Sequence, residues 1–525
     1  MKQLSGSDNL FLTQEKGNQV AHVGGLAIYD PSTAPGGAVR FKAILDFFTD
    51  RLHASKVFRR RLVHVPFDLD RPYWVDDPEI DVEYHIRHIA LPQPGDWRQL
   101  CIQVARIHAR PLDLKKPAWE AYVIEGLDNI AGVPKGSFAM YTKFHHAAID
   151  GEAGAAIIGA LHSLSAEPET KREHPITTIA DREPTALELL ARMVGNRAHQ
   201  LKLAASLAND VVPLVAGLGR KKFGSLLGQR DGTPPEDEVV PTDDKRVPVT
   251  RFNRPLSPHR VIEAIPVALH DCQTIRAVFA GVTINDIFLA SSGGAVRKYL
   301  EAKGELPAAS LRALVPMSTR GESKNADSGN QIGMAVWPLR TEIANAALRL
   351  QMIHRGSSRG KQQAAAVGKD LPAKLIAVAP SILVDKVLRN FLVPSFNLTV
   401  SNLRGPAVPL YMAGAKLLTF MPINMLLDGM GLSITGFSYN GILWVCVVAD
   451  RSALPDPAFF AECFKESFAE LLAAAARPSV PLIAKPAPDT RPAKAHTARK
   501  AGKRSGTVKK AAAAKKAVKV RRGRS

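Results

Sequence analysis

The sequence predicts a mixed α/β fold. Segments with strand-like patterns interleave with segments whose apolar residues have helical spacing, and this mixture recurs in a second block after a polar connection. The length of 525 residues also exceeds what one hydrophobic core usually organises. With 46% apolar and 22% charged residues, the composition is that of a globular protein. We therefore expect two domains plus extensions.

The first block, placed at residues 1–185, alternates strands and helices. Val23–Tyr29 predicts a strand, and Phe41–Leu52 predicts an amphipathic helix because its apolar residues recur every three or four positions. Ser137–Phe144 predicts another strand, and a helix is expected from about Glu152 to Leu164.

A connection follows at residues 186–248. It begins with a stretch at 186–218 that is expected to be helical. It ends in a polar, proline-containing segment at 228–248, which predicts a linker between domains.

The second block, placed at residues 249–480, repeats the mixed pattern. The predicted strands are Val261–Val267, Arg312–Pro316, Asn397–Ser401 and Ile442–Val448, and the predicted helices are Thr283–Leu300, Ala346–Ser357 and Pro457–Ala475.

Most of the positive charge lies in a tail at residues 485–525. This tail holds fifteen Lys and Arg against one acid, so it carries +14 of the formal net charge of +20. Its Ala-, Lys- and Arg-rich composition cannot bury a core, and we expect it to be disordered when free. Such a tail would attract any polyanion, including nucleic acid or anionic lipid headgroups. The alternative is a solvated extension with no specific partner.

Targeting and redox signals are weak. No run of eighteen apolar residues predicts a membrane span, and the start of the sequence lacks the apolar region of an export signal. The four scattered cysteines show no CxxC spacing, so we expect buried thiols in a reducing compartment. The predicted location is cytoplasmic.

The strongest local motif is His145-His146-Ala147-Ala148-Ile149-Asp150-Gly151. It places two imidazoles at the end of a predicted strand, where a base with a pKa near neutrality can be held in a fixed position. Asp150 can cap the following helix or brace the loop through an arginine, and Gly151 permits a tight backbone. The alternative is an ordinary polar turn with two hydrogen-bonded histidines.

This motif resembles the HHxxxDG signature of the coenzyme A-dependent acyltransferase superfamily, and further segments resemble its wax ester synthase/diacylglycerol acyltransferase branch. Eight such segments follow in family order along the chain. They are Asp8 with Phe11-Leu12, His22–Gly25, Pro111–Asp113, Pro117–Glu120, Phe252–Arg260, Asn285-Asp286, Val315–Ser318 and Ser401–Pro406.

The resemblance implies an acyl-CoA-dependent O-acyltransferase that forms triacylglycerol or wax ester from diacylglycerol or a fatty alcohol. It implies that His146 is the general base and that His145 supports it. Asp150 is implied to be a structural brace beside Gly151, and Asn285 to contribute to an oxyanion site or to substrate positioning. Acyl-CoA would be a co-substrate, with no tightly bound cofactor, no metal and no covalent acyl-enzyme.

The resemblance further implies two chloramphenicol-acetyltransferase-like domains with a tunnel between them. Peripheral association with the inner membrane or with lipid inclusions would suit lipid substrates, and the amphipathic stretches Leu201–Leu218 and Leu371–Val393 are candidates for it or for ordinary packing. The alternative function is a catalytically weak relative that binds lipid or nucleic acid through the basic tail.

Two departures from the family pattern stand out. Ala118 replaces the usual Leu in Pro-Leu-Trp, and Val20-Ala21 replaces Pro-Met before the His-Val-Gly. Both changes bring acyl-chain or acceptor preference into question but not the chemistry.

Two rival sites are weaker. Residues 356–360 match the GxSxG pattern of serine hydrolases, but they follow a segment that looks helical, whereas a nucleophile elbow follows a strand. A metal site at His145, His146 and Asp150 is disfavoured because adjacent histidines diverge.

Overall fold

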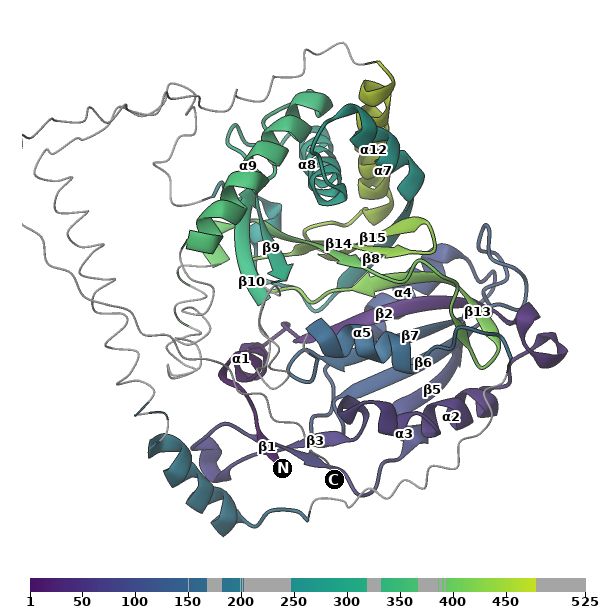
Figure 1. Ribbon diagram of the computed structural model, residues 1–525, viewed down its shortest axis with the longest axis vertical. Coiled ribbons are helices and arrows are strands. Elements are labelled where there is room, and N and C mark those ends of the chain that lie inside the picture. Colours follow the sequence, from purple (N-terminus) through teal and green to yellow (C-terminus); the bar gives the residue numbers. More distant parts are fainter. Residues whose placement is uncertain are drawn as a thin grey trace, which may run out of the picture. The chain divides into compact units, whose positions relative to one another are not determined.

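The computed structural model describes residues 1–149, 151–167, 182–198, 200, 202, 247–318, 332–366, 386, 390 and 393–477. Met1–Val480 forms one compact unit. Within the described residues the strands form two six-stranded sheets and one three-stranded sheet, with helices packed on them (Figure 1). The predicted mixed α/β class is confirmed.

The first large sheet has the order β12-β13-β2-β7-β6-β5. All its neighbours are antiparallel except β5 and β6, which are parallel. Its strands are β2 (His22–Asp30), β5 (Ile86–Ala90), β6 (Trp119–Glu125), β7 (Phe138–His145), β12 (Tyr411–Met412) and β13 (Ala415–Ile423). The two strands from the second half of the chain thus complete a sheet that the first half begins.

The second large sheet has the order β10-β9-β11-β14-β15-β8. Here β11 is parallel to both β9 and β14, and the remaining pairs are antiparallel. Its strands are β8 (Arg260–Ala268), β9 (Arg312–Ser318), β10 (Ile332–Pro338), β11 (Leu398–Arg404), β14 (Leu432–Tyr439) and β15 (Ile442–Asp450).

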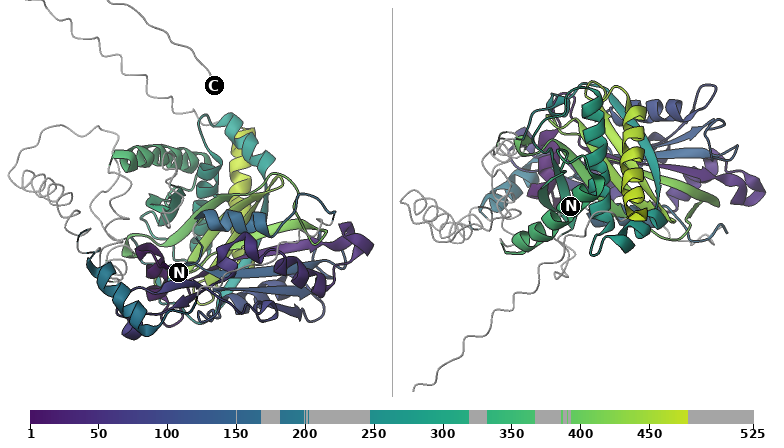
Figure 2. Two further views of the ribbon diagram at one scale, coloured as in Figure 1. Left: turned by 60° about the horizontal axis from the view of Figure 1, so that its bottom comes forward. Right: turned by 90° about the horizontal axis from the view of Figure 1, so that it is seen from above.

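Four helices gather on the second sheet, with α8 and α12 side by side (Figure 2). They are α7 (Leu269–Val278), α8 (Ile284–Ala302), α9 (Ala346–Ala366) and α12 (Pro457–Ala476). The Thr283 side chain accepts from the N–H of Asp286 while the Asp286 side chain accepts from the N–H of Thr283, so a capping box fixes the start of α8.

The first half contributes α1 (Gly6–Gln14), α2 (Phe41–Thr49), α3 (Val82–His85), α4 (Trp97–His108) and α5 (Gly151–Ala160). In α2 the buried residues Ile44 and Phe48 are four positions apart, as the helical pattern predicts. Helix α4 packs against β8 of the other half, and both contribute to one apolar cluster.

The three-stranded sheet consists of β1 (Lys2–Gln3), β3 (Arg60–Val63) and β4 (Tyr73–Asp76), in the order β1-β4-β3. Its side chains alternate between two apolar clusters. Leu62 and Trp74 belong to one cluster, whereas Tyr73 and Val75 belong to another that includes Leu189 of the helix at 186–198. This small sheet is therefore covered on both faces.

All the strands and helices predicted within the described residues are present, with ends that differ by a few residues, except that α9 runs to Ala366, well beyond the predicted end at Ser357. The helix at 186–218 is described only as far as residue 202. Nearly all of the linker at 228–248 and of the stretches 201–218 and 371–393, and the whole tail, lie outside the described residues. The domain boundaries stay predictions.

None of the helices in the described part of the chain is long and apolar enough to cross a membrane. The four cysteines are free and buried, as the sequence predicts.

Candidate active site

The two motif histidines lie at the end of β7, an inner strand of the first sheet. Every residue of β7 is buried, and the strand is paired on both sides, with β2 and with β6. His145 is its last residue, and His146 begins the turn that leads to α5. Because β7 is hydrogen-bonded to a strand on each side, it gives the histidines a rigid support.

Backbone hydrogen bonds hold both histidines. The N–H of His145 donates to the carbonyl of Ala118 at 2.9 Å, and the N–H of His146 donates to the carbonyl of Ala21 at 2.8 Å. Ala118 and Ala21 belong to the two places, Ala118 and Val20-Ala21, where the sequence departs from the family pattern. Their contacts use main-chain oxygens, so these substitutions leave the hydrogen bonds to the histidines in place.

The ring of His145 is fully buried, and its hydrogen bonding fixes its tautomer. Its Nδ1 accepts from the N–H of Ala147 at 3.1 Å, so in the neutral ring the proton resides on Nε2. This Nε2 faces the Oε1 atom of Glu15 at 3.6 Å. His145 therefore points away from solvent, toward a carboxylate.

Glu15 is a site residue that the sequence analysis missed. Its Oε1 accepts from the N–H of Ala21 at 2.7 Å in addition to facing His145. Burial acts to raise the pKa of Glu15, but the contacts with His145 and Ala21 and the charge of Lys143 outweigh it, so the pKa is lowered. No sequence signal distinguishes this glutamate, which follows the last residue of α1.

The ring of His146 stacks on Phe11 of α1, with ring centroids 3.9 Å apart and planes 16° apart. Burial lowers the pKa of His146 to about 4; its own backbone acts in the opposite direction, and the charge of His145 adds to the lowering. The Nδ1 atom is buried without a hydrogen-bond partner in the described part of the chain. At neutral pH the ring is therefore an uncharged base.

The other predicted site residues are only partly placed. Asp150 lies outside the described residues, and Gly151 is the first residue of α5. Asn285 is the second residue of α8 and is partly exposed. No contact within the described ranges joins it to His146, so its role stays a prediction.

Asp286, the neighbour of Asn285, is a buried connector between α8 and α9. Its carboxylate accepts from the Ser357 hydroxyl at 2.8 Å and contacts Nδ1 of His354 at 3.0 Å. Burial acts to raise the pKa of Asp286, but hydrogen bonds from Thr283, His354 and Ser357 lower it. These bonds fix the end of α8 that carries Asn285.

The position of residues 356–360 also bears on the rival hydrolase hypothesis. Ser358, the serine of the GxSxG match, lies inside α9 and not after a strand. The GxSxG match is therefore not a nucleophile elbow, as the sequence context predicts.

Two further motifs, Pro117–Glu120 and His22–Gly25, contribute residues that pack in the protein interior. Trp119 is buried, stacks on His85 at 4.5 Å and donates to the carbonyl of Phe58. A Cβ atom on Gly24 would lie 2.6 Å from the Tyr141 ring, and one on Gly25 would lie 2.6 Å from Phe420. Glycine is needed there because aromatic rings from both neighbouring strands lie over β2.

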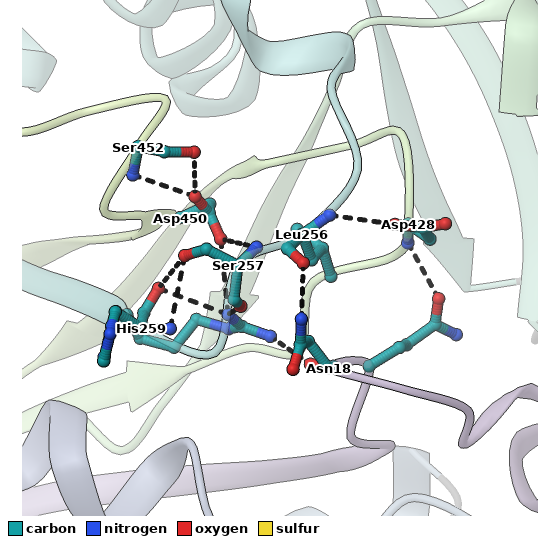
Figure 3. Close-up of polar contacts among 9 residues, drawn as sticks. Asn18, Leu256, Ser257, His259, Asp428, Asp450 and Ser452 are labelled. Carbon is teal, nitrogen blue, oxygen red and sulfur yellow. Dashed lines mark hydrogen bonds and ion pairs between the residues drawn. The ribbon is translucent and has the colours of Figure 1, made fainter.

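The Phe252–Arg260 motif joins the two halves of the chain (Figure 3). Arg260 pairs with Asp450 at 3.4 Å, with side-chain exposures of 2% and 3%, and also donates to the carbonyl of Asn18. The Asn18 side chain donates to the carbonyl of Leu256 at 2.9 Å, and the N–H of Leu256 donates to Asp428. The turn that follows Glu15 is thereby fixed to the second half.

A surface cavity of about 850 Å³ lies between α2 and β5. Its lining includes Phe41, Leu45, Arg87 and His88, and none of the predicted site residues. Among the described residues, no group of three or more His, Cys, Asp or Glu is placed to hold a metal ion.

The family models and the similar proteins of known name indicate the same family. Residues 4–288 match the wax ester synthase/diacylglycerol acyltransferase catalytic domain, and residues 328–472 match the C-terminal domain of the same family. The chain is 32% identical over 472 residues to "O-acyltransferase WSD" of Acinetobacter baylyi, covering 87% of this chain and 93% of that protein. It is 31% identical over 456 residues to "Probable diacyglycerol O-acyltransferase tgs2" of Mycobacterium tuberculosis, covering 86% and 94%.

Two solved structures have a fold similar to that of this chain. The wax ester synthase/diacylglycerol acyltransferase from Marinobacter aquaeolei VT8 matches with a TM-score of 0.62 and 25% identity, covering 90% of this chain and all of that chain. The first condensation domain of the calcium-dependent antibiotic synthetase shares the fold, with a TM-score of 0.54 and 13% identity, covering 91% and 97%. The chain belongs to the wax ester synthase/diacylglycerol acyltransferase family.

Proposed function

We propose that the protein transfers a long fatty acyl group from acyl-CoA to the hydroxyl of diacylglycerol, of a fatty alcohol or of both, with His146 as general base. One observation carries the proposal. The His146 imidazole is uncharged at neutral pH and held at the end of a buried strand, between main-chain hydrogen bonds and the Phe11 ring. An acyltransferase needs such a base, because the acceptor hydroxyl must lose its proton as it attacks the thioester.

The chemical step follows from these positions. A ring nitrogen of His146 accepts the proton of the acceptor hydroxyl while the oxygen attacks the thioester carbonyl carbon. The tetrahedral intermediate collapses, the carbon–sulfur bond breaks, and the coenzyme A thiolate leaves and receives the proton from the imidazolium. General-base assistance of this kind typically contributes about 10²- to 10⁴-fold to the rate.

The supporting residues have separate roles in this proposal. The buried His145 ring and the partly buried Glu15 carboxylate form a pair that fixes the turn beneath the catalytic ring. Asn285, at the start of α8, contributes to the oxyanion site or positions the substrate, and loss of one oxyanion donor typically costs about 3–4 kcal/mol. Asp150 braces the turn before Gly151.

The substrates are assigned from relatives and chemistry. The relatives are named for diacylglycerol acylation and wax ester synthesis, and a starter condensation domain of rhizomide synthetase with this fold was solved with C8-CoA. Acyl-CoA is accordingly proposed as a co-substrate that arrives and leaves in each cycle. The transfer of an acyl group from a thioester to a hydroxyl oxygen needs no tightly bound cofactor.

The test is direct. Purified protein receives a long-chain acyl-CoA with diacylglycerol or hexadecanol, and release of free coenzyme A is followed together with formation of the ester. His146→Ala should lower turnover by about 10²-fold or more. His162→Gln, which changes a half-buried histidine outside the site, is the control and should retain activity. Near-normal turnover by His146→Ala would refute the assignment.

The basic tail supplies a second, separable property. With fifteen Lys and Arg in residues 485–525, it should attract anionic surfaces of the inner membrane or lipid inclusions by about 1 kcal/mol per basic residue near the surface. The alternative partner is nucleic acid. Deleting 485–525 should reduce partition onto anionic vesicles at low salt and leave turnover on a soluble acceptor unchanged, whereas unchanged partition would dismiss this role.

A further inference from the structure

The catalytic turn is backed by the three-stranded sheet. Leu62 of β3 and Trp74 of β4 share an apolar cluster with Ala147, the residue after His146. The opposite face of the same sheet presents Tyr73 and Val75 to the helix at 186–198. Sheet and helix layers are each about 10 Å thick, so the outer side of this helix lies two layers from the catalytic turn.

The helix at 186–198 is firmly attached by its inner side. Leu189 is buried against the sheet, and the Asn196 amide donates to the Tyr73 hydroxyl at 2.6 Å and to Asp70 at 3.1 Å. Arg197 donates to the carbonyl of Leu69 at 2.6 Å. The orientation of the helix, and hence the face that it turns outward, is therefore determined.

That outward face is apolar. Leu187 is 77% exposed and Val194 is 64% exposed, and they lie seven positions apart with the exposed Ala191 between them. This spacing places all three on one side of a helix. A soluble helix ordinarily presents polar side chains there, so this row is an apolar surface without a partner within the described residues.

The neighbouring turn adds an aromatic residue. Phe67 is 91% exposed and Leu69 is 44% exposed. Phe67 has φ of 59° and Asp68 has φ of 51°, a left-handed conformation that non-glycine residues rarely adopt. The turn is closed by the N–H of Asp68, which donates to Val65, and by the contact of His64 with Asp68. A strained turn thus holds an aromatic ring out in solvent.

Basic side chains flank this surface. Arg192 and Arg197 are exposed on the same helix, as is Lys202 just beyond it. Of the nearby acidic residues, Glu188 is paired with Arg182 and Asp68 contacts His64. An apolar row flanked by cations is typical of a helix that lies in a membrane interface with anionic headgroups. The chemistry of the surface matches a lipid surface better than a protein partner.

We infer that Phe67, Leu69, Leu187 and Val194 form a docking face by which the enzyme binds an anionic lipid surface that holds the acceptor lipid. The inference rests on the proposed function for the identity of the acceptor. It does not involve the basic tail, which acts through charge alone.

The experiment compares the full-length protein with Leu187→Glu/Val194→Glu. Glutamate is a good helix former, so the helix is preserved while its outward face becomes charged. Leu164→Glu is the matched control, because Leu164 is 76% exposed and lies beside the Ser163–Tyr411 bridge, away from the docking face. Binding to vesicles of phosphatidylcholine and phosphatidylglycerol is measured by flotation at high salt, which screens the attraction of the tail.

The double variant should partition onto these vesicles at least about tenfold more weakly, since burial of each apolar side chain is lost, and the control should match wild type. Turnover on diacylglycerol in vesicles should fall in parallel, with turnover on a short soluble alcohol unchanged. Wild-type partition by the double variant, or equal loss on both acceptors, would overturn the docking face. Failure of the proposed function has a different signature, because then wild type releases no coenzyme A with either acceptor.

Discussion

At the scale of single residues, the environment of His146 determines how the enzyme should respond to pH. A base with a pKa of about 4 is unprotonated throughout the neutral range. We therefore expect kcat/KM on a soluble acceptor to stay nearly constant from pH 8 down to about pH 5 and to fall below that. A rate that already halves near pH 6.5 would show that the ring titrates as an exposed histidine.

Phe11 is the residue through which this behaviour can be changed. Its ring covers that of His146 at 3.9 Å, so Phe11→Ala should admit water and raise the pKa of the imidazole toward its ordinary value of 6.5. The acid limb of the kcat/KM profile should move to higher pH, with a several-fold loss at pH 5.5 that is largely recovered at pH 8. Phe11→Leu, which retains apolar cover, is the control. An equal loss at every pH would mean that Phe11 only packs.

At the scale of elements, Arg260 links β8 to the turn after α1. The pair with Asp450 is almost fully buried, so Arg260→Met leaves a carboxylate without its cation and should destabilise the protein by about 3–5 kcal/mol. The matched control is Arg251→Met, since its partner Glu305 is 38% exposed and such pairs contribute about 1 kcal/mol or less. Urea denaturation of both variants measures the difference, and equal loss would contradict this account.

The sequence predicts individual strands and helices better than it predicts their pairing. Ile442–Val448 was recognisable as a strand because its apolar residues are continuous, and Val261–Val267 because apolar residues predominate in a short run. Helix α8 was recognisable because it is long and capped. The pairing of β13 with β2 was not predictable, because nearly four hundred residues separate the two strands and local patterns carry no information on such contacts.

The candidate site was only partly recognisable in the sequence. His145 and His146 are found from their spacing with Asp150 and Gly151, because that motif is local. Glu15 and Phe11 escape notice as partners of the histidines, since they come from α1 and meet β7 only in the folded chain. Phe11 lies in a segment that resembles the family, but neither it nor Glu15 has a local pattern that indicates contact with the histidines.

At the scale of the whole molecule, several histidines are buried in their neutral form. Burial lowers the pKa of His108 to about 3 and of His162 to about 4, and it lowers the pKa of His22 as well. Unfolding exposes these rings, which then bind protons below about pH 6.5 while the folded protein does not. The free energy of unfolding should therefore fall steadily as the pH decreases from 6.5 toward 4.

Urea denaturation at pH 7.5, 6 and 5 checks this expectation. His162→Gln should show a shallower decline, because glutamine can keep the contact with Tyr29 but takes up no proton. A free energy of unfolding that is constant between pH 7.5 and pH 5 would contradict the burial of these rings in neutral form.

The position of β13 has a consequence for the newly synthesised chain. Strand β2, which lies beside the histidine-bearing β7, obtains its other neighbour only from residues 415–423. While the ribosome is still translating the preceding residues, β2 has an open edge that invites pairing with other chains. The catalytic half therefore completes its folding only when synthesis is nearly finished, and a chain terminated before residue 415 is expected to aggregate and not to form a partly active enzyme.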